Sequence, residues 1–212
     1  ELNNPLTAVT AYADALVAKL AAAGHDAADV EKLRRIQEAG QRILRFSRDL
    51  VAYARPPQQQ VELVDLAKVL EQAAQMCEPA LQAASARVER RLEPAPPVPG
   101  QRGSLLQVFV NLLTNAAHAL EPRGGTVTLE LAPSGDHVAA RVRDDGPGMA
   151  PEVKRRAFEP FFTTKPDGKG SGLGLSIVQG IVSRHGGAIS VESAPGAGTA
   201  FTVMLPVKGP RP

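Results

Sequence analysis

At 212 residues the chain has room for one large domain or two modest ones, because domains commonly contain about 100 to 200 residues. Apolar residues make up 43% and charged residues 22%, so the chain can bury a core and need not be disordered; a net charge of +2 without a dominant Lys/Arg block gives no electrostatic case for binding nucleic acid or a membrane surface. The single cysteine, Cys77, excludes an intrachain disulfide and the cysteine-rich zinc sites, so we expect a reducing, cytoplasmic setting.

The sequence shows no targeting or membrane-spanning segment. No stretch reaches the roughly 18 apolar residues of a membrane span, and the start Glu-Leu-Asn-Asn-Pro lacks the basic and apolar regions of a signal peptide. The first residue is not methionine, so the sequence is interpreted as a fragment whose parent protein could still be membrane-anchored.

Near the start of the chain, apolar residues recur at alternating steps of four and three, which is the seam of helices that pack against other helices. Gly24, His25 and Asp26 interrupt this pattern, so an antiparallel hairpin of two helices is predicted. Two helices cannot enclose both seams, and we therefore expect a second copy to complete a four-helix bundle in a homodimer. The seam positions are Leu6, Val9, Ala13, Leu16 and Leu20, then Ile36, Ala39, Ile43, Phe46, Leu50 and Tyr53.

The sequence Arg55-Pro56-Pro57 ends the second helix, because proline disfavours helix at the residue before it and supplies no amide donor. The predicted division is a hairpin over 1–55, a linker over 56–60, a second domain over 61–207 and a tail over 208–212. The second domain mixes helical and strand patterns and is predicted to be α+β. Helices are expected near 65–84, 105–120 and 174–183, and strands near 88–92, 126–131, 138–142, 188–192 and 199–205.

Two carboxamides, Asn111 and Asn115, stand four residues apart on the apolar helix 105–120 and therefore share one face. Neutral amide oxygens suit Mg²⁺, which takes hard oxygen ligands and shares nucleotide phosphates. Taken alone, such a pair is more often surface decoration or a helix-packing hydrogen bond, and the pattern leaves both interpretations open.

Two glycine-rich segments follow. In Asp144-Asp145-Gly146-Pro147-Gly148 a carboxylate at a strand end suits an exocyclic amine and the glycines admit a flat ligand, although a plain turn has the same composition. In Gly170-Ser171-Gly172-Leu173-Gly174-Leu175 the glycines and the exposed amides of a helix start suit a polyphosphate. This segment neither follows a strand directly nor ends in Lys-Ser/Thr, so a Rossmann or Walker site is not expected.

Between the two glycine groups lies Phe158-Glu-Pro-Phe161-Phe162-Thr163-Thr164-Lys165, followed by Pro166-Asp-Gly-Lys-Gly. Aromatic residues beside such loose chain indicate a lid with an apolar anchor and a mobile body. The alternative is that the three phenylalanines belong to the core.

These four segments, in this order, resemble the N box, first glycine box, F box and second glycine box of histidine kinases, and Gly196-Ala-Gly198-Thr199 resembles their third glycine element. The resemblance covers about Val61 to Leu205 and implies the α/β two-layer sandwich of the Bergerat (GHKL) type, which binds ATP with Mg²⁺. It implies that Asn115 binds Mg²⁺, that Asn111 supports the phosphate region and that Asp144 accepts a hydrogen bond from the adenine amine. His118 is either a basic group near phosphate or a plain surface histidine. The other residues that the resemblance assigns to the nucleotide are Gly146, Gly148, Lys165, Gly170, Gly172, Gly174, Leu175 and Thr199.

The start Glu1-Leu-Asn-Asn4-Pro5-Leu6-Thr7 resembles the H box of the same family without its histidine, so the phosphate-accepting histidine is expected immediately before Glu1. In the family the acidic residue after the histidine helps to deprotonate it, and a polar residue three further on positions a water. Those catalytic residues would be Glu1 and Asn4. The alternative is that both are ordinary helix-start residues.

The chain departs from the family at Gly100-Gln101-Arg102, where relatives commonly have Gly-Asp, and so lacks a carboxylate that caps or tethers the following helix. Asn111 stands where gyrase-like relatives carry a glutamate that activates water, which favours transfer to a protein side chain over ATP hydrolysis. The resemblance implies an ATP-dependent histidine autokinase that passes phosphate to an aspartate of a response regulator, with phosphatase activity toward that regulator as a further expectation. The alternative function is a nucleotide-gated interaction module, either a degenerate kinase or a chaperone-like ATPase of the same fold. Neither nucleic acid nor direct membrane contact is expected of this chain.

Overall fold

The computed structural model describes residues 3–22, 27–54, 60–165 and 170–208, apart from some side chains in the first two helices. The chain forms two compact units, one of residues 1–56 with 163–173 and the other of residues 57–162 with 174–212. The sequence-based limits of hairpin, linker, second domain and tail stay a prediction. Among the helices of the described ranges, none combines the length and the apolarity that crossing a bilayer requires.

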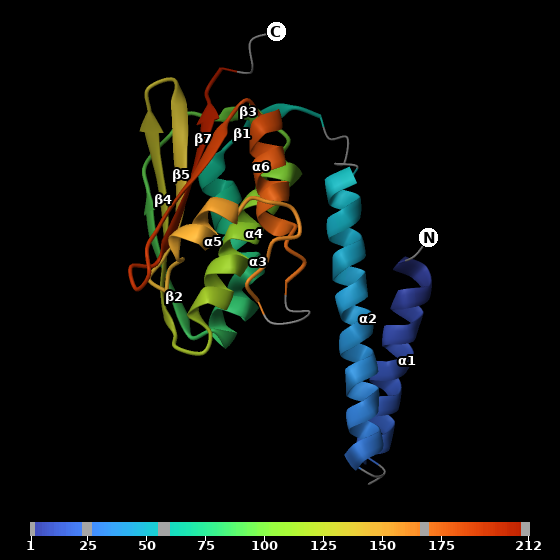
Figure 1. Cartoon of the computed structure of the whole chain (residues 1–212). Helices are drawn as coiled ribbons and strands as arrows, with labels where there is room; N and C mark the ends of the chain where they lie inside the picture. Colours follow the sequence, from blue (N-terminus) through green and yellow to red (C-terminus); the bar gives the residue numbers. More distant parts are fainter. Residues whose placement is uncertain (1–2, 23–26, 55–59, 166–169, 209–212) are drawn as a thin grey trace. The chain divides into compact units, whose positions relative to one another are not determined.

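The first unit contains the predicted helical hairpin, formed by α1 (Asn3–Ala22) and α2 (Ala27–Ala54) (Figure 1). The two helices approach closely, because a Cβ on Gly40 would lie only 2.7 Å from Thr10 Cγ2. Asp14 also accepts a hydrogen bond from the Gln37 side chain across the helix pair. The predicted turn at Gly24–Asp26 lies outside the described residues.

The apolar seam of the hairpin is only partly covered within one copy. Ala13 and Val30 are 4% and 8% exposed, so they pack between the two helices. Other large apolar side chains of the hairpin are about half exposed, namely Val9, Leu16, Ile36 and Ile43. The hairpin therefore retains an apolar surface that its own two helices do not bury.

The second unit is built on a five-stranded sheet of order β2-β4-β5-β7-β6, in which β2 runs parallel to β4 and all other neighbours are antiparallel. The strands are β2 (Ala86–Leu92), β4 (Gly125–Ser134), β5 (His137–Asp144), β6 (Ala188–Ser193) and β7 (Thr199–Pro206). Two short strands not predicted from the sequence, β1 (Glu62–Val64) and β3 (Val98–Gly100), pair antiparallel in a separate small sheet.

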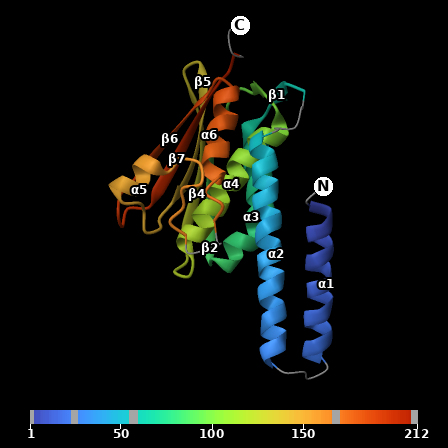
Figure 2. The same cartoon turned by 45° about the vertical axis from the view of Figure 1, so that its right-hand side comes forward.

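Three long helices cover one face of the five-stranded sheet, as Figures 1 and 2 show. They are α3 (Leu66–Ala83), α4 (Arg102–Leu120) and α6 (Gly174–Arg184). The short α5 (Pro151–Arg156), which was not predicted from the sequence, lies between the first glycine-rich segment and the F box. A helix layer on a largely antiparallel sheet confirms the predicted α+β class and two-layer architecture.

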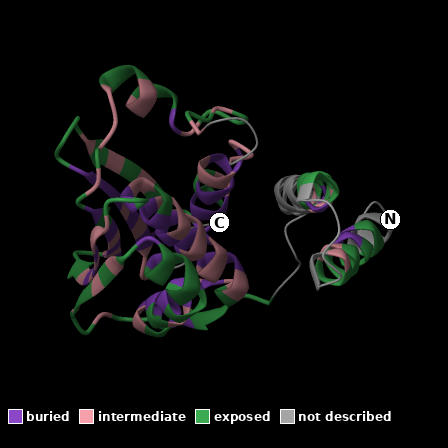
Figure 3. Ribbon diagram, turned by 90° about the horizontal axis from the view of Figure 1, so that it is seen from below, coloured by how far each residue is buried: buried purple, intermediate pink, exposed green. Residues whose placement is uncertain are grey.

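The core lies between these helices and the sheet, where the buried segments gather in Figure 3. On β4, Val127, Leu129 and Leu131 are buried while the residues between them are partly exposed, as the period of two requires. The opposite face carries ion pairs, among them Arg141 with Glu192 at 2.7 Å. A polar side chain buried on the helix-covered face lies among apolar residues and away from water, so it needs hydrogen-bond partners there.

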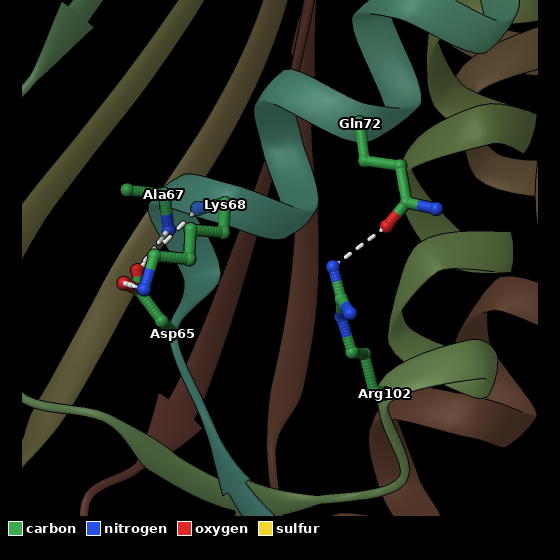
Figure 4. Close-up of polar contacts among 5 residues, drawn as sticks. All are labelled: Asp65, Ala67, Lys68, Gln72 and Arg102. Carbon is green, nitrogen blue, oxygen red and sulfur yellow. Dashed lines mark hydrogen bonds and ion pairs between the residues drawn. The ribbon is translucent and has the colours of Figure 1, made fainter.

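The start of α3 follows from its cap, because Asp65 Oδ1 accepts from the backbone amides of Ala67 and Lys68 at 3.1 and 3.4 Å (Figure 4). The start of α4 has no such side-chain cap, since the N-cap residue Gln101 makes no capping hydrogen bond with its side chain. Instead, Arg102 donates to Gln72 Oε1 at 2.8 Å and so joins the first residue of α4 to α3 (Figure 4).

Candidate functional site

Asp144 ends β5 on the helix-covered face of the sheet. It is paired in register with Val127 on β4 and Thr199 on β7, and it follows the buried Val142 by one full strand period. The side chain is consequently only 4% exposed, and its Oδ1 accepts from the Gly146 amide at 3.0 Å. A buried carboxylate thus stands at the strand end where the sequence predicts an acceptor.

The environment of Asp144 raises the pKa of its carboxyl group. Loss of water on burial is the largest cause, and the backbone amides of Gly146 and Thr199 partly offset it by hydrogen bonding to the ionised form. The neighbouring Asp145 carboxylate raises the pKa further.

The loops beside Asp144 pack backbone against backbone. A Cβ on Gly148, whose φ is +68°, would collide with the Ala194 carbonyl oxygen, and a Cβ on Gly198, at φ +76°, would collide with the carbonyl oxygen of Asp144. The Gly196 amide also donates to the Pro147 carbonyl at 2.7 Å. Glycine is therefore required at positions 148 and 198 both for its conformation and for its lack of a side chain.

Ser193, at the end of β6, braces these loops and was not predicted from the sequence. Its Oγ accepts from the Met149 amide and donates to the Gly198 carbonyl, both at 2.8 Å, and lies 3.1 Å from Thr199 Oγ1. Its only sequence signal is its place just before the third glycine element.

The N-box asparagines lie on one stripe of α4. Leu112, Leu113 and Ala116 are buried, which confirms that the apolar residues take the other faces, whereas Asn111 and Asn115 are half-buried. Asn111 Nδ2 donates to the Gly174 carbonyl at 3.3 Å, so this stripe meets the start of α6.

The same stripe of α4 also meets the first glycine segment. A Cβ on Gly146 would lie 3.3 Å from the Ala119 carbonyl oxygen and 3.4 Å from Ala119 Cβ. Residues 111, 115 and 119 recur every four positions and so line one side of the helix. Asn115 therefore lies between the residue that contacts α6 and the residue that contacts the segment following Asp144.

The start of α6 is Gly174, as predicted, with Leu175 in its first turn. The first amides of an α-helix have no partner within the helix, and they give this end partial positive charge. The arrangement suits an anionic group beside Asn111. His118 is exposed in the last turn of α4. Both of its interpretations, a basic group near phosphate and a plain surface histidine, stay open.

Lys165, Gly170 and Gly172 belong to the stretch 163–173, in which residues 166–169 lie outside the description. A Cβ on Gly170 would lie 2.8 Å from Thr163 Oγ1 and 3.1 Å from Lys165 Cδ, so the two described parts of this stretch meet at Gly170. The Lys165 amide donates to Thr163 Oγ1 at 3.2 Å. How these residues act with the other candidates stays a prediction.

The three phenylalanines of the F box have different environments. Phe158 meets Phe201 edge to face at a centroid distance of 6.3 Å, which fits the predicted apolar anchor. Phe162 lies under the Arg156 guanidinium at 4.2 Å. Phe161 is 58% exposed at φ +65°, so the alternative that all three are core residues is wrong.

The predicted catalytic pair of the hairpin is not described in full. Glu1 lies outside the described residues, and Asn4 lies in α1 with its side chain outside the description. Their roles stay a prediction.

The residues described above fit a magnesium nucleotide. Asp144 offers a buried acceptor, and Thr199 is buried beside it. The carboxamide of Asn115 supplies the kind of oxygen that Mg²⁺ accepts, and the α6 start suits phosphate.

The family described as histidine kinase-, DNA gyrase B- and HSP90-like ATPase matches residues 100–209, which include α4, both glycine segments and the third glycine element. The chain belongs to this ATPase family. The implied GHKL-type fold is thereby confirmed.

Individual proteins of this family resemble the chain over most of its length. The sensor histidine kinase ZraS of Salmonella typhi is 35% identical over 217 residues, covering 98% of this chain and 44% of that protein. The sensor kinase CckA of Brucella abortus (strain 2308) is 33% identical over 224 residues, covering 97% and 23%. The chain thus spans less than half the length of these curated relatives.

Solved structures agree with the fold. The mycobacterial sensor histidine kinase MprB matches with a TM-score of 0.61 and 32% identity, covering 71% of this chain and 99% of that one. Full-length ShkA in complex with AMPPNP matches with a TM-score of 0.76 and 26% identity, covering all of this chain and 45% of that one.

Proposed function

We propose that this chain is the catalytic core of a two-component histidine autokinase, which transfers the γ-phosphoryl group of ATP to a histidine of the hairpin. The observation that carries the proposal is the stripe of α4, where Asn115 lies between the contact of Asn111 with Gly174 and the contact of Ala119 with Gly146. This arrangement suits a nucleotide whose base lies near Asp144 and whose phosphates lie near the start of α6.

The residues near Asp144 and along α4 have separate tasks in binding. The Asp144 carboxylate accepts from the exocyclic amine of adenine, and Gly146 and Gly148 keep side chains away from the base. Asn111 and the first amides of α6 orient the phosphates. Mg²⁺, held by Asn115 together with phosphate oxygens and waters, would neutralise the charge of the transferring group.

The acceptor is proposed to be the histidine expected immediately before Glu1. Glu1 takes the proton from one ring nitrogen while the other forms the new N–P bond, and the bond from the γ-phosphorus to the bridging oxygen of ADP breaks. Asn4 orients a water for the phosphatase reaction, in which the water attacks the phosphorus of a phosphorylated regulator aspartate and releases inorganic phosphate and the free carboxylate. The phosphoryl group then passes from the histidine to an aspartate of a response-regulator partner.

Nucleotide binding is also supported by a relative, because ShkA was solved in complex with AMPPNP. The names of ZraS, CckA and MprB as sensor kinases support the kinase assignment. The exposed seam residues Val9, Leu16, Ile36 and Ile43 support a homodimer in which two hairpins form a four-helix bundle.

The deciding experiment extends the chain by one histidine before Glu1 and incubates it with Mg²⁺ and ATP labelled at the γ-phosphate. We expect label on the protein that is stable to base and labile to acid, as a phosphohistidine requires. The matched control carries glutamine in place of the added histidine and should remain unlabelled. Calorimetry with Mg·ATP on the same samples measures binding separately.

An extended chain that binds nucleotide but stays unlabelled contradicts the kinase proposal and favours the nucleotide-gated interaction module. A chain that releases no heat with Mg·ATP, and that no nucleotide protects against unfolding, contradicts the nucleotide site itself.

A further inference from the structure

We infer that His185, just after the end of α6, is a positioning residue that holds α4 and α6 in the arrangement that nucleotide binding requires. This inference rests on the proposed function of the site. His185 was not among the residues selected from the sequence.

His185 is only 8% exposed, although it follows directly on the last residue of a helix. Its backbone amide bonds the carbonyls of Ile181 and Val182 at 3.2 and 3.1 Å, and the chain then turns at Gly186 with φ +68°. The residue is thereby held at the helix end with its ring directed inward.

Both nitrogens of the ring have partners. Nδ1 lies 2.8 Å from the Ile181 carbonyl, which can only accept, so Nδ1 carries the proton. Nε2 is then the acceptor for the backbone amide of Gln101 at 3.0 Å. Only the neutral Nδ1-H tautomer makes both bonds.

The bond from Gln101 matters because Gln101 is the N-cap of α4 and its side chain does not cap the helix. The ring also packs directly on the preceding backbone, since a Cβ on Gly100 would lie 2.8 Å from His185 Cδ2. His185 thus binds the junction of β3 and α4.

The helices α4 and α6 are consequently joined at both ends of α6. His185 forms one link at the end of α6, and Asn111 forms the other at its start through the Gly174 carbonyl. The second link lies within the nucleotide site, so a shift of α4 after loss of the first link would displace Asn111 and Asn115 from the phosphate region.

Two substitutions at position 185 distinguish the roles of the two ring nitrogens. In His185→Asn the amide nitrogen can replace Nδ1, but no atom reaches Gln101. In His185→Gln the longer side chain can place its oxygen where Nε2 accepts. We expect His185→Asn to weaken Mg·ADP binding by the 212-residue chain roughly three- to tenfold, the equivalent of one hydrogen bond, and His185→Gln to restore most of it.

A stability control is Val138→Ala in β5, a fully buried site distant in sequence from both links. We expect it to lower the urea midpoint without weakening Mg·ADP binding. Ring nitrogen shifts measured by ¹⁵N NMR give an independent test, and they should report the Nδ1-H tautomer of His185 in the unsubstituted chain.

The inference is overturned if His185→Asn binds Mg·ADP like the unsubstituted chain, if His185→Gln is as weak as His185→Asn, or if Val138→Ala loses as much affinity at equal stability. It is overturned equally by an Nε2-H tautomer, a result that does not depend on whether either variant folds. Failure of the unsubstituted chain to bind Mg·ADP would instead reject the proposed function, and the positioning role with it.

Discussion

At the residue scale, Asp144 combines a raised pKa with a role that needs the ionised form. Burial raises the pKa of its carboxyl group, whereas the amine of adenine requires an acceptor. Ionised Asp144 therefore lowers the stability of the fold, but it is the form that is proposed to bind the adenine amine. That opposition makes its two effects separable by substitution and by pH.

The substitution Asp144→Asn should weaken Mg·ATP binding at least about tenfold, because the amide presents a donor or a weaker acceptor to the adenine amine. The same change should leave the free energy of unfolding at neutral pH equal or higher, because it removes a buried charge. Calorimetry and urea unfolding measure the two effects. Asp145→Asn, on the exposed neighbour that accepts from the Thr126 amide, is the matched control and should retain binding.

The pH dependence has a defined sign. The folded pKa of Asp144 lies above its unfolded value, so the cost of the ionised group is present above the folded pKa and disappears as the pH falls below it. The stability advantage of Asp144→Asn should therefore shrink on acidification, and Mg·ATP binding by the unsubstituted chain should weaken over the same range. An advantage that grows on acidification would contradict this account.

At the element scale, helical and strand periods accounted for most of the second unit. The period of 3.6 predicts that Asn111 and Asn115 share a face, and a period of two with a following Asp-Gly turn predicts Asp144 at a strand end. The two elements, α4 and β5, are long enough for the local residue pattern alone to predict them.

The elements and residues that were missed depend on distant partners. The strands β1 and β3 are three residues each, and their mutual pairing forms them. Ser193 and His185 bond groups 44 and 84 residues away in the sequence, so no local pattern could assign their roles. A histidine followed by two glycines after an amphipathic helix was the only signal for His185.

Replacing two helical glycines by alanine is expected to change the free energy of unfolding in opposite directions. Gly40→Ala in α2 places a Cβ 2.7 Å from Thr10 Cγ2 and should destabilise the hairpin by about 1 kcal/mol or more, despite the better helix propensity of alanine. Gly180→Ala in α6 meets only the end of Arg184 at 3.6 Å and should stabilise its unit by about 0.5–1 kcal/mol. Urea unfolding followed by circular dichroism compares them. If Gly40→Ala stabilises the chain as well, the close approach of α1 and α2 is wrong.

At the scale of the whole molecule, the two units are expected to perform separate tasks. The hairpin retains an exposed apolar seam, whereas the α/β unit encloses its own core. Assembly and nucleotide binding should therefore respond to different substitutions.

Ile43→Lys, at a seam position that is 51% exposed, should convert the dimer to a monomer, because it places a charge in the proposed four-helix interface. Mg·ATP affinity should remain within about twofold, since Asn111, Asn115 and Asp144 lie in the other unit. Sedimentation and calorimetry measure the two properties. Arg34→Gln, at an exposed position of the same helix, should leave the dimer intact. A chain that is monomeric before any substitution would contradict the bundle.

The close packing of Gly148 on Ala194 and of Gly198 on Asp144 means that main-chain atoms form the wall beside the predicted adenine position. An inhibitor anchored to those atoms would meet a surface that mutation changes only by disrupting the loops themselves. Resistance to such a compound would therefore have to arise elsewhere, through the side chains that border the wall.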